Sequence, residues 1–196
     1  IVTNIYAWTA LLLVLLTYGM ETGFFRFANR EDYDSPSVYK TAFFTLLSTS
    51  ALFSVLVIVF QHPLANVLGY ADHAEFISMM FVTVAIDAFA CIPFAYLRYQ
   101  KRPILFASLK LLFVILNIAF NLLFLVVLGK NDVFYVFLSN ILATPIQTLC
   151  LLPFTLPKGG YFDGKILREM LRYSLPLLIL GVAGIMNQTR DRILFP

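Results

Sequence analysis

The sequence predicts an all-α membrane protein that crosses the bilayer several times, and three observations lead to this fold class. Hydrophobic residues make up 60% of the 196 positions and charged residues only 13%. Soluble domains carry about 25% charged residues, so this chain has too few to cover a water-facing surface. The mean hydropathy is +0.84. The apolar residues also gather in runs of about 20, the length of a helix that crosses the hydrocarbon core. These observations exclude a soluble enzyme, a disordered segment and a nucleic-acid binder.

Six apolar stretches have the length and composition of membrane-spanning helices. They are residues 5–27, 41–60, 76–97, 104–128, 133–154 and 173–188. The connectors between them carry the prolines, glycines and charges that end helices. Pro103, for example, opens its helix at a position where the missing N–H group has no cost. All connectors are short, so we expect no extramembrane domain within these residues.

The basic residues predict the orientation of the helices. The first, third and fifth connectors, with the helix ends beside them, hold three, four and four of the 14 basic residues. The second connector holds none and the fourth only Lys130. Because cytoplasmic loops carry the excess of Lys and Arg, we expect the first, third and fifth connectors to be cytoplasmic. The residues concerned are Arg26, Arg30, Lys40, Arg98, Lys101, Arg102, Lys110, Lys158, Lys165, Arg168 and Arg172.

Ionisable residues inside the spans are candidate functional positions, because a charge at membrane depth costs a few kcal/mol or more. Counting from Arg30 at 1.5 Å per residue places Glu21 about 13 Å deep, near the midplane, and Asp87 reaches a similar depth. For Glu21, a protonated carboxyl bonded to a neighbouring helix explains the position equally well. Arg26 lies one turn deeper than the inner interface, where it either snorkels or serves a function. The polar run at residues 187–192 closes the last span.

Uncharged polar residues form a second set inside the spans. Asn117 and Asn121 are four residues apart, and Asn140 and Gln147 are seven apart, so each pair lies on one stripe of its helix. Two roles fit these stripes. They either form hydrogen bonds between helices or line a polar cavity.

Prolines are expected to interrupt three spans, at Pro93, Pro145 and Pro176. Pro93 leaves the carbonyl of Phe89 without its helical donor. A carboxyl near such a broken turn, as Asp87 is, suits a relay of protons or cations. Interrupted helices of this kind are more typical of a transporter than of a rigid anchor.

Several blocks of the sequence resemble bacterial polysaccharide-biosynthesis flippases, which are oligosaccharide-lipid flippases of the multidrug/oligosaccharidyl-lipid/polysaccharide exporter superfamily. The first block is YGMETGFFRF, and the last is GVAGIMNQTRDR, which follows the family pattern Gly-x-Ala-Gly-x-Met-Asn-x-Thr-x-Asp-Arg. Together they cover nearly the whole chain, in order. The blocks are residues 18–27, 86–88, 93–99, 102–103, 173–177 and 181–192.

The resemblance implies two lobes of six or more helices that face each other across a central cavity. Residues 1–155 would hold the second to sixth helices of the first lobe, residues 156–172 a cytoplasmic inter-lobe linker, and residues 173–196 the first helix of the second lobe. We therefore expect a piece of a longer, multi-pass protein of the bacterial inner membrane. It would be a transporter and not an enzyme, because no catalytic or metal-binding motif and no large outer loop occurs. No cofactor and no metal are expected.

The resemblance also implies a function: flipping of a polyprenyl-diphosphate sugar from the cytoplasmic to the periplasmic leaflet by alternating access. The diphosphate needs cations in the cavity, with Arg26 the first candidate and Arg190 and Arg192 next. Protons or Na⁺ would couple through Glu21, Asp87 and Asp191. The cavity would also contain Asn117, Asn121, Asn140, Gln147, Asn187 and Gln188. The alternative is a proton- or Na⁺-coupled drug or cation antiporter of the same fold.

Overall fold

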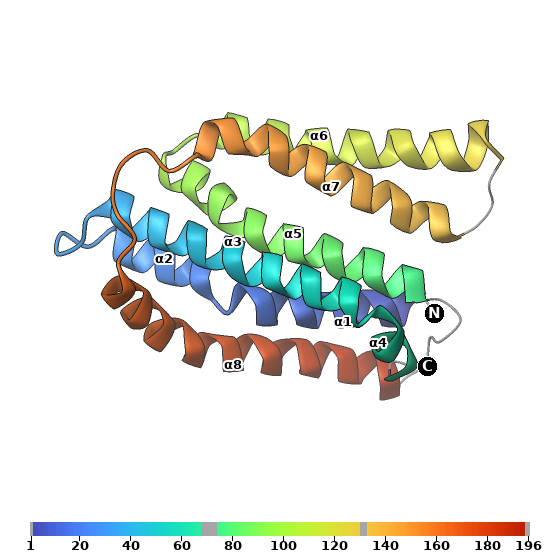
Figure 1. The fold of residues 1–196 in the computed structure, drawn as a ribbon, viewed down its shortest axis with the longest axis horizontal. Coiled ribbons are helices and arrows are strands. Elements are labelled where there is room, and N and C mark those ends of the chain that lie inside the picture. Colours follow the sequence, from blue (N-terminus) through green and yellow to red (C-terminus); the bar gives the residue numbers. More distant parts are fainter. Residues whose placement is uncertain (1, 68–73, 130–132, 195–196) are drawn as a thin grey trace.

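The computed structural model is a bundle of long helices that run side by side (Figure 1). It describes residues 2–67, 74–129 and 133–194, with the side chains of residues 8–66, 75–129 and 134–184. These residues contain no strand, so the all-α prediction is confirmed. The helices are α1 (Val2–Thr17), α2 (Met20–Ala28), α3 (Ser35–Val59), α4 (Gln61–Val67), α5 (Ala74–Tyr99), α6 (Pro103–Leu122) with its π-helical continuation η2 (Leu123–Val127), α7 (Val133–Thr155) and α8 (Gly164–Leu194).

The bundle is built around α5. This helix contacts α1, α2 and α3 on one side and the α6–α7 pair on the other, while α8 packs against α1, α2 and α3 (Figure 1). In the α5 span, 61% of the most apolar window is buried, whereas none of the corresponding window in α6 is. The outer helices therefore present apolar surface to the surroundings, as expected for a protein that lies in lipid.

Five segments among the described residues are long and apolar enough to cross a membrane, so the chain is a polytopic membrane protein. The expected span at 173–188 lies within α8, whose side chains from residue 185 onward are outside the described set. This helix begins at Gly164, so the second part of the expected linker is helical. The five segments are Trp8–Ala28, Ser35–Val59, Glu75–Tyr99, Pro103–Val127 and Phe134–Thr155.

The first span is not the single helix that the sequence predicts over residues 5–27. It breaks between α1 and α2, where Tyr18 (φ 34°) and Gly19 (φ 67°) both adopt left-handed backbone. Glycine adopts this conformation without strain. The Ser174 hydroxyl of α8 donates a hydrogen bond of 3.1 Å to the Gly19 carbonyl, which also accepts one of 3.1 Å from the Gly23 N–H, so α8 is tied to the break.

The three prolines expected to interrupt helices do not end them. Pro93 lies inside α5, Pro145 inside α7 together with Pro153, and Pro176 inside α8. Each proline removes one backbone hydrogen bond, but the turns around it stay helical because neighbouring helices hold them. Within the described residues the interruption of a span lies at Gly19 instead.

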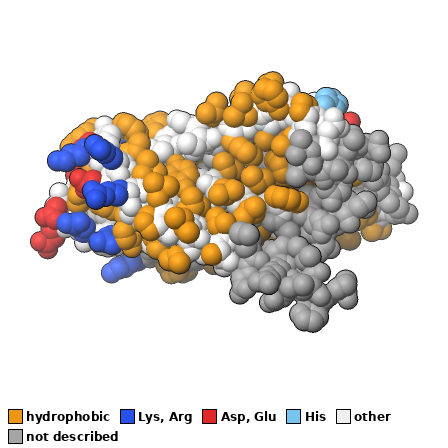
Figure 2. Space-filling view, turned by 90° about the horizontal axis from the view of Figure 1, so that it is seen from below, with side chains coloured by type: hydrophobic (Ala, Val, Ile, Leu, Met, Phe, Trp, Pro, Cys, Tyr) orange, Lys and Arg blue, Asp and Glu red, His pale blue; other side chains and the backbone are white. Residues whose placement is uncertain are grey.

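Charged side chains gather at one end of the bundle, and apolar side chains cover the part next to it (Figure 2). The connectors at residues 29–34, 100–102 and 156–163 lie at this end, which we call the basic end (Figure 1). The grouping of these connectors agrees with the orientation expected from the Lys and Arg residues. That the basic end faces the cytoplasm stays a prediction.

Next to the basic end, an aromatic core holds α2, α3, α5 and α8 together. Phe24 of α2 is fully buried, with its ring edge-on to those of Tyr39 and Tyr99. The Tyr39 ring also stacks on Tyr96 at a centroid distance of 3.9 Å. Since such contacts add to the energy of burial, α2 has a fixed place between α5 and α8.

The linker that leads to α8 is docked on the first turns of α3. Hydrogen bonds from or to the side chains of Ser37, Tyr39, Lys40 and Thr41 hold its backbone. The pairs are Tyr39 to the Thr155 carbonyl, Lys40 to the Gly160 carbonyl at 3.1 Å, Tyr161 N–H to Ser37 at 3.1 Å, and Asp163 N–H to Thr41 at 3.0 Å. The backbones approach closely at Gly160, where a Cβ atom would lie 2.6 Å from Pro36 and Ser37.

Candidate functional site

A row of ionisable side chains, with one phenylalanine among them, follows one face of α5. Asp87, Cys91, Phe94 and Arg98 are spaced by four, three and four residues, which places them on the same side of the helix. Helices α2 and α6 both contact α5 and bring further charged groups to this row. We call Glu21, Asp87, Cys91, Arg98 and Lys110 the charged face.

The centre of the charged face is an ion pair between α2 and α5. The Arg98 guanidinium binds Oε1 of Glu21, and the Cys91 thiol donates a hydrogen bond of 3.0 Å to Oε2. The Glu21 side chain is 35% exposed and that of Arg98 is 43% exposed. Glu21 lies seven residues before the end of α2, about 10 Å along the helix axis. This agrees with the depth counted from Arg30, and the carboxylate has a cationic partner there in Arg98.

Arg98 is thus more than one of the basic residues that flank the third connector. Its guanidinium lies 5.5 Å from the ring centroid of Phe25 in α2 and 5.6 Å from that of Phe106 in α6. Cations bind to aromatic faces at such distances. The two rings and the carboxylate together hold the Arg98 head group in the space between α2 and α6.

Lys110 supplies the second cation of the charged face. It lies seven residues inside α6, about 10 Å from the start of the helix. Its ammonium group is 4.1 Å from the Phe94 ring centroid, and it interacts electrostatically with Asp87 and Cys91. In the sequence Lys110 is grouped with the basic residues that flank the third connector. Its place two turns inside the apolar span at 104–128 was the signal that could have identified it.

Arg26, the first candidate for anion binding, lies on another side of α2. Its guanidinium carbon is 4.0 Å from the ring centroid of Tyr173 in α8. Phe27 also contacts the Tyr173 ring, at a centroid distance of 6.4 Å. The structure therefore brings Arg26 together with α8, while Glu21 and Asp87 lie on the charged face.

The polar stripes of α6 and α7 meet each other. Asn117 donates a hydrogen bond of 2.8 Å to the Asn140 side chain, and Asn121 donates one of 3.0 Å to the Asn117 side chain. Gln147 is 3% exposed and donates to the Leu109 carbonyl at 3.0 Å. These contacts agree with the first of the two expected roles, hydrogen bonding between helices. Cavity lining by these residues stays a prediction.

The remaining candidates belong to the polar run near the end of α8. Their backbone is helical, but their side chains fall outside the described residues, so their predicted roles remain predictions. They are Asn187, Gln188, Arg190, Asp191 and Arg192.

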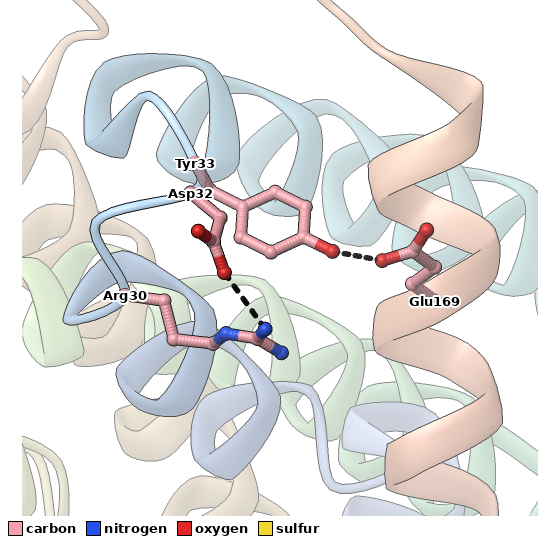
Figure 3. Close-up of polar contacts among 4 residues, drawn as sticks. All are labelled: Arg30, Asp32, Tyr33 and Glu169. Atoms are coloured by element: carbon pink, nitrogen blue, oxygen red, sulfur yellow. Dashed lines mark hydrogen bonds and ion pairs between the residues drawn. The ribbon is translucent and has the colours of Figure 1, made fainter.

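A cleft of about 270 Å³ lies at the basic end, between the first connector, the linker and α8. In it the Tyr33 hydroxyl donates a hydrogen bond to Glu169 of α8, and Arg30 pairs with Asp32 at 2.9 Å (Figure 3). The bond to Glu169 raises the pKa of Tyr33, and burial and the charge of Glu169 add to this effect. The cleft is lined by Asp32, Tyr33, Asp34, Tyr161, Asp163, Lys165, Ile166 and Glu169.

The acidic lining makes this cleft unsuited to anions. Among the described residues, no group of His, Cys, Asp or Glu side chains could hold a metal ion. The Tyr33 contact instead fastens the first connector to α8. The cleft therefore helps to position α8, and the charged face is the stronger candidate for function.

The charged face can perform two kinds of chemistry. Two carboxylates and two cations lie on helices with apolar spans, where unpaired charge is costly and marks substrate or ion pathways. Arg98 and Lys110 can bind an anion, since guanidinium and ammonium groups both recognise phosphate. Glu21 and Asp87 can bind a proton or a cation. The aromatic rings beside the cations keep these groups in place.

Comparison with protein-family models matches residues 4–195 to a family described as polysaccharide biosynthesis protein. The match includes every residue of the charged face. Comparisons with curated proteins and with solved structures gave no match.

Proposed function

Because the chain belongs to the polysaccharide biosynthesis protein family, we propose that it is part of a flippase for lipid-linked oligosaccharides. In this proposal a polyprenyl-diphosphate sugar moves from the cytoplasmic to the periplasmic leaflet of the bacterial inner membrane by alternating access. The protein would act as a transporter and not as an enzyme. The membrane-spanning helices and the family support a role in polysaccharide biosynthesis and export.

The observation that carries the proposal is the charged face. A diphosphate cannot enter about 30 Å of hydrocarbon without cations to pair with it. Arg98 and Lys110 provide two such cations within the spans, next to the rings of Phe106 and Phe94. In this proposal, Arg98 and Lys110 bind the diphosphate of the substrate. Arg26, Arg190 and Arg192 would guide it elsewhere along its path.

The carboxylates of the charged face have a separate proposed role. Glu21 pairs with Arg98, and Asp87 interacts with Lys110, so each carboxylate can change its charge when a proton or Na⁺ binds. Such a change would couple the opening and closing of the cavity to an ion gradient. Asp191 would belong to the same set, near the end of α8.

Export in cells tests this proposal. The Arg98→Gln and Lys110→Gln variants of the full-length protein are each expressed in a strain that lacks the wild-type gene. We expect surface polysaccharide to fall at least ten-fold while the lipid-linked intermediate accumulates and the protein level in the membrane stays normal. Arg30→Gln is the matched control, because Arg30 pairs with Asp32 in the connector. Normal export by both charged-face variants would contradict the proposed site.

A drug or cation antiporter is the second candidate. It is favoured by one observation: Glu21 and Asp87 share a face with the aromatic rings of Phe25 and Phe94, a setting that also suits an organic cation. Deleting the protein would then lower resistance to cationic compounds and leave surface polysaccharide unchanged. The opposite result supports the flippase.

A further inference from the structure

The ion pair between Glu21 and Arg98 suggests how substrate binding is controlled. We propose that Glu21 is an internal competitor for the anion of the substrate: its carboxylate occupies Arg98 in the unliganded protein, and a phosphate-bearing ligand must displace it. This inference rests on the proposed function, because it needs an anionic substrate that reaches the charged face.

The Glu21 carboxylate occupies the position at Arg98 that the anionic group of a ligand would take. Its Oε1 binds the Arg98 guanidinium and its Oε2 accepts from the Cys91 thiol, so both oxygens are occupied. Arg98 is further held by two aromatic rings, Phe25 and Phe106. The guanidinium can therefore stay in place when one anion replaces another.

The surroundings of Glu21 favour such an exchange. Arg98 and Cys91 face Glu21 from α5. The positive charge of Lys110, on α6, interacts electrostatically with the Cys91 thiol. On the neighbouring side of α2, Arg26 is turned toward Tyr173 of α8. Within the described part of the chain, Arg98 is the cation that pairs with Glu21. A ligand that takes Arg98 thus competes with one carboxylate and meets a second cation in Lys110.

The exposure of the pair makes it reachable. Glu21 is 35% and Arg98 43% exposed, so the pair is open on one side. Phosphate accepts two parallel hydrogen bonds from a guanidinium, which makes it a strong rival of a carboxylate. The Glu21 carboxylate nevertheless weakens the binding of phosphate, because it stays close to Arg98 and competes for it at a high effective concentration. Glu21 would thus prevent the site from holding its substrate too tightly to release it.

Binding of a short polyprenyl diphosphate, farnesyl diphosphate, tests the inference. The full-length protein is purified in detergent, and the dissociation constant is measured by calorimetry for the wild type, Glu21→Gln and Glu21→Ala. We expect both variants to bind about five-fold more tightly, a factor typical for the loss of one partly exposed competing pair. Two variants are used so that the result does not depend on the folding of one of them.

Two controls complete the experiment. Glu31→Gln removes a carboxylate from the exposed first connector and should leave the dissociation constant unchanged. Arg98→Gln should abolish binding. If the wild type binds farnesyl diphosphate and the Glu21 variants bind equally or more weakly, the competitor role is wrong and the proposed substrate class stands. If neither the wild type nor the Glu21 variants bind it, the substrate class fails, and the competitor role with it.

Discussion

The hydroxyl of Ser174 donates a hydrogen bond of 3.1 Å to the carbonyl oxygen of Gly19, and it ties α8 to the break where α1 ends and α2 begins. The same Oγ atom would lie 2.7 Å from a Cβ atom placed on Gly23, one turn further along. Gly19, which precedes α2, and Gly23 within α2 therefore both contact one serine of α8. The packing of α2 on α8 depends on this close approach.

Gly23→Ala should destabilise the protein by about 1–3 kcal/mol, because the added methyl group crowds the Ser174 hydroxyl and breaks its hydrogen bond to the Gly19 carbonyl. Thermal unfolding in detergent measures the effect. Gly184→Ala is the control, since a Cβ atom there meets nothing within 4 Å. The double variant with Ser174→Ala should be about as stable as Ser174→Ala alone. Strictly additive losses would show that the two sites are independent.

Asp87 and Lys110 should behave as a coupled pair. Removing one of two opposite charges inside a membrane span leaves the other uncompensated. We therefore expect Asp87→Asn and Lys110→Met each to lower the melting temperature, and the double variant to lower it by less than their sum. The expected coupling is about 0.5–1 kcal/mol, because Lys110 is exposed. A double-mutant cycle with additive losses would mean that the two charges do not interact.

The contact between Asn117 and Asn140 predicts a structural role with a small energy. Hydrogen bonds between membrane helices contribute about 0.6 kcal/mol on average. Asn117→Ala and Asn140→Ala should therefore reduce stability slightly and non-additively, and they should leave export near the wild-type level. Loss of export by a variant of normal stability would favour the cavity-lining role instead.

Tyr33 predicts a sensitivity to high pH. Its pKa is raised above the ordinary value of 10.0, first by the hydrogen bond to Glu169. A raised pKa means that the folded protein holds the proton more firmly. The stabilisation is therefore complete below about pH 10 and is lost as the pH rises through the higher folded value.

The stability difference between the wild type and Tyr33→Phe should thus shrink above pH 10. Melting temperatures from pH 8 to 11 measure it. Tyr161→Phe, a change at an exposed tyrosine of the same cleft, should show no such pH dependence. A constant difference between the wild type and Tyr33→Phe across this range would contradict the assignment.

The membrane-spanning segments could be predicted from the sequence because the information is local. A run of about 20 apolar residues is sufficient to identify a helix that crosses the bilayer. The break at Gly19 could not be predicted in this way. Its hydrogen-bond partner, Ser174, is 155 residues away along the chain, and by residue type Pro93 is a stronger signal of a helix interruption than a single glycine.

The charged face was predicted only in part. Glu21 and Asp87 were identified because a carboxylate is conspicuous in an apolar run. Their cations were assigned to the connector, since a basic residue near a helix end is ordinarily an anchor. Arg98 is 77 residues from Glu21, so only the packing of α2 on α5 reveals the pair. Arg26 was the candidate instead, but the rotation of α2 turns it toward α8.

The docked linker also bears on how the protein is made. Residues 36–41 of α3, which hold the linker, leave the ribosome more than 100 residues before Gly160 does. The receptor for the linker is therefore synthesised well before α8, and α8 can be positioned by helices already made. Both Gly159 and Gly160 have left-handed backbone, but a Cβ atom at Gly160 would lie 2.6 Å from Pro36, whereas one at Gly159 would meet nothing within 4 Å. An epitope tag inserted before Gly159 should therefore leave the amount of protein in the membrane near the wild-type level. The same tag inserted next to Gly160 should lower that amount, as measured by immunoblotting of membranes.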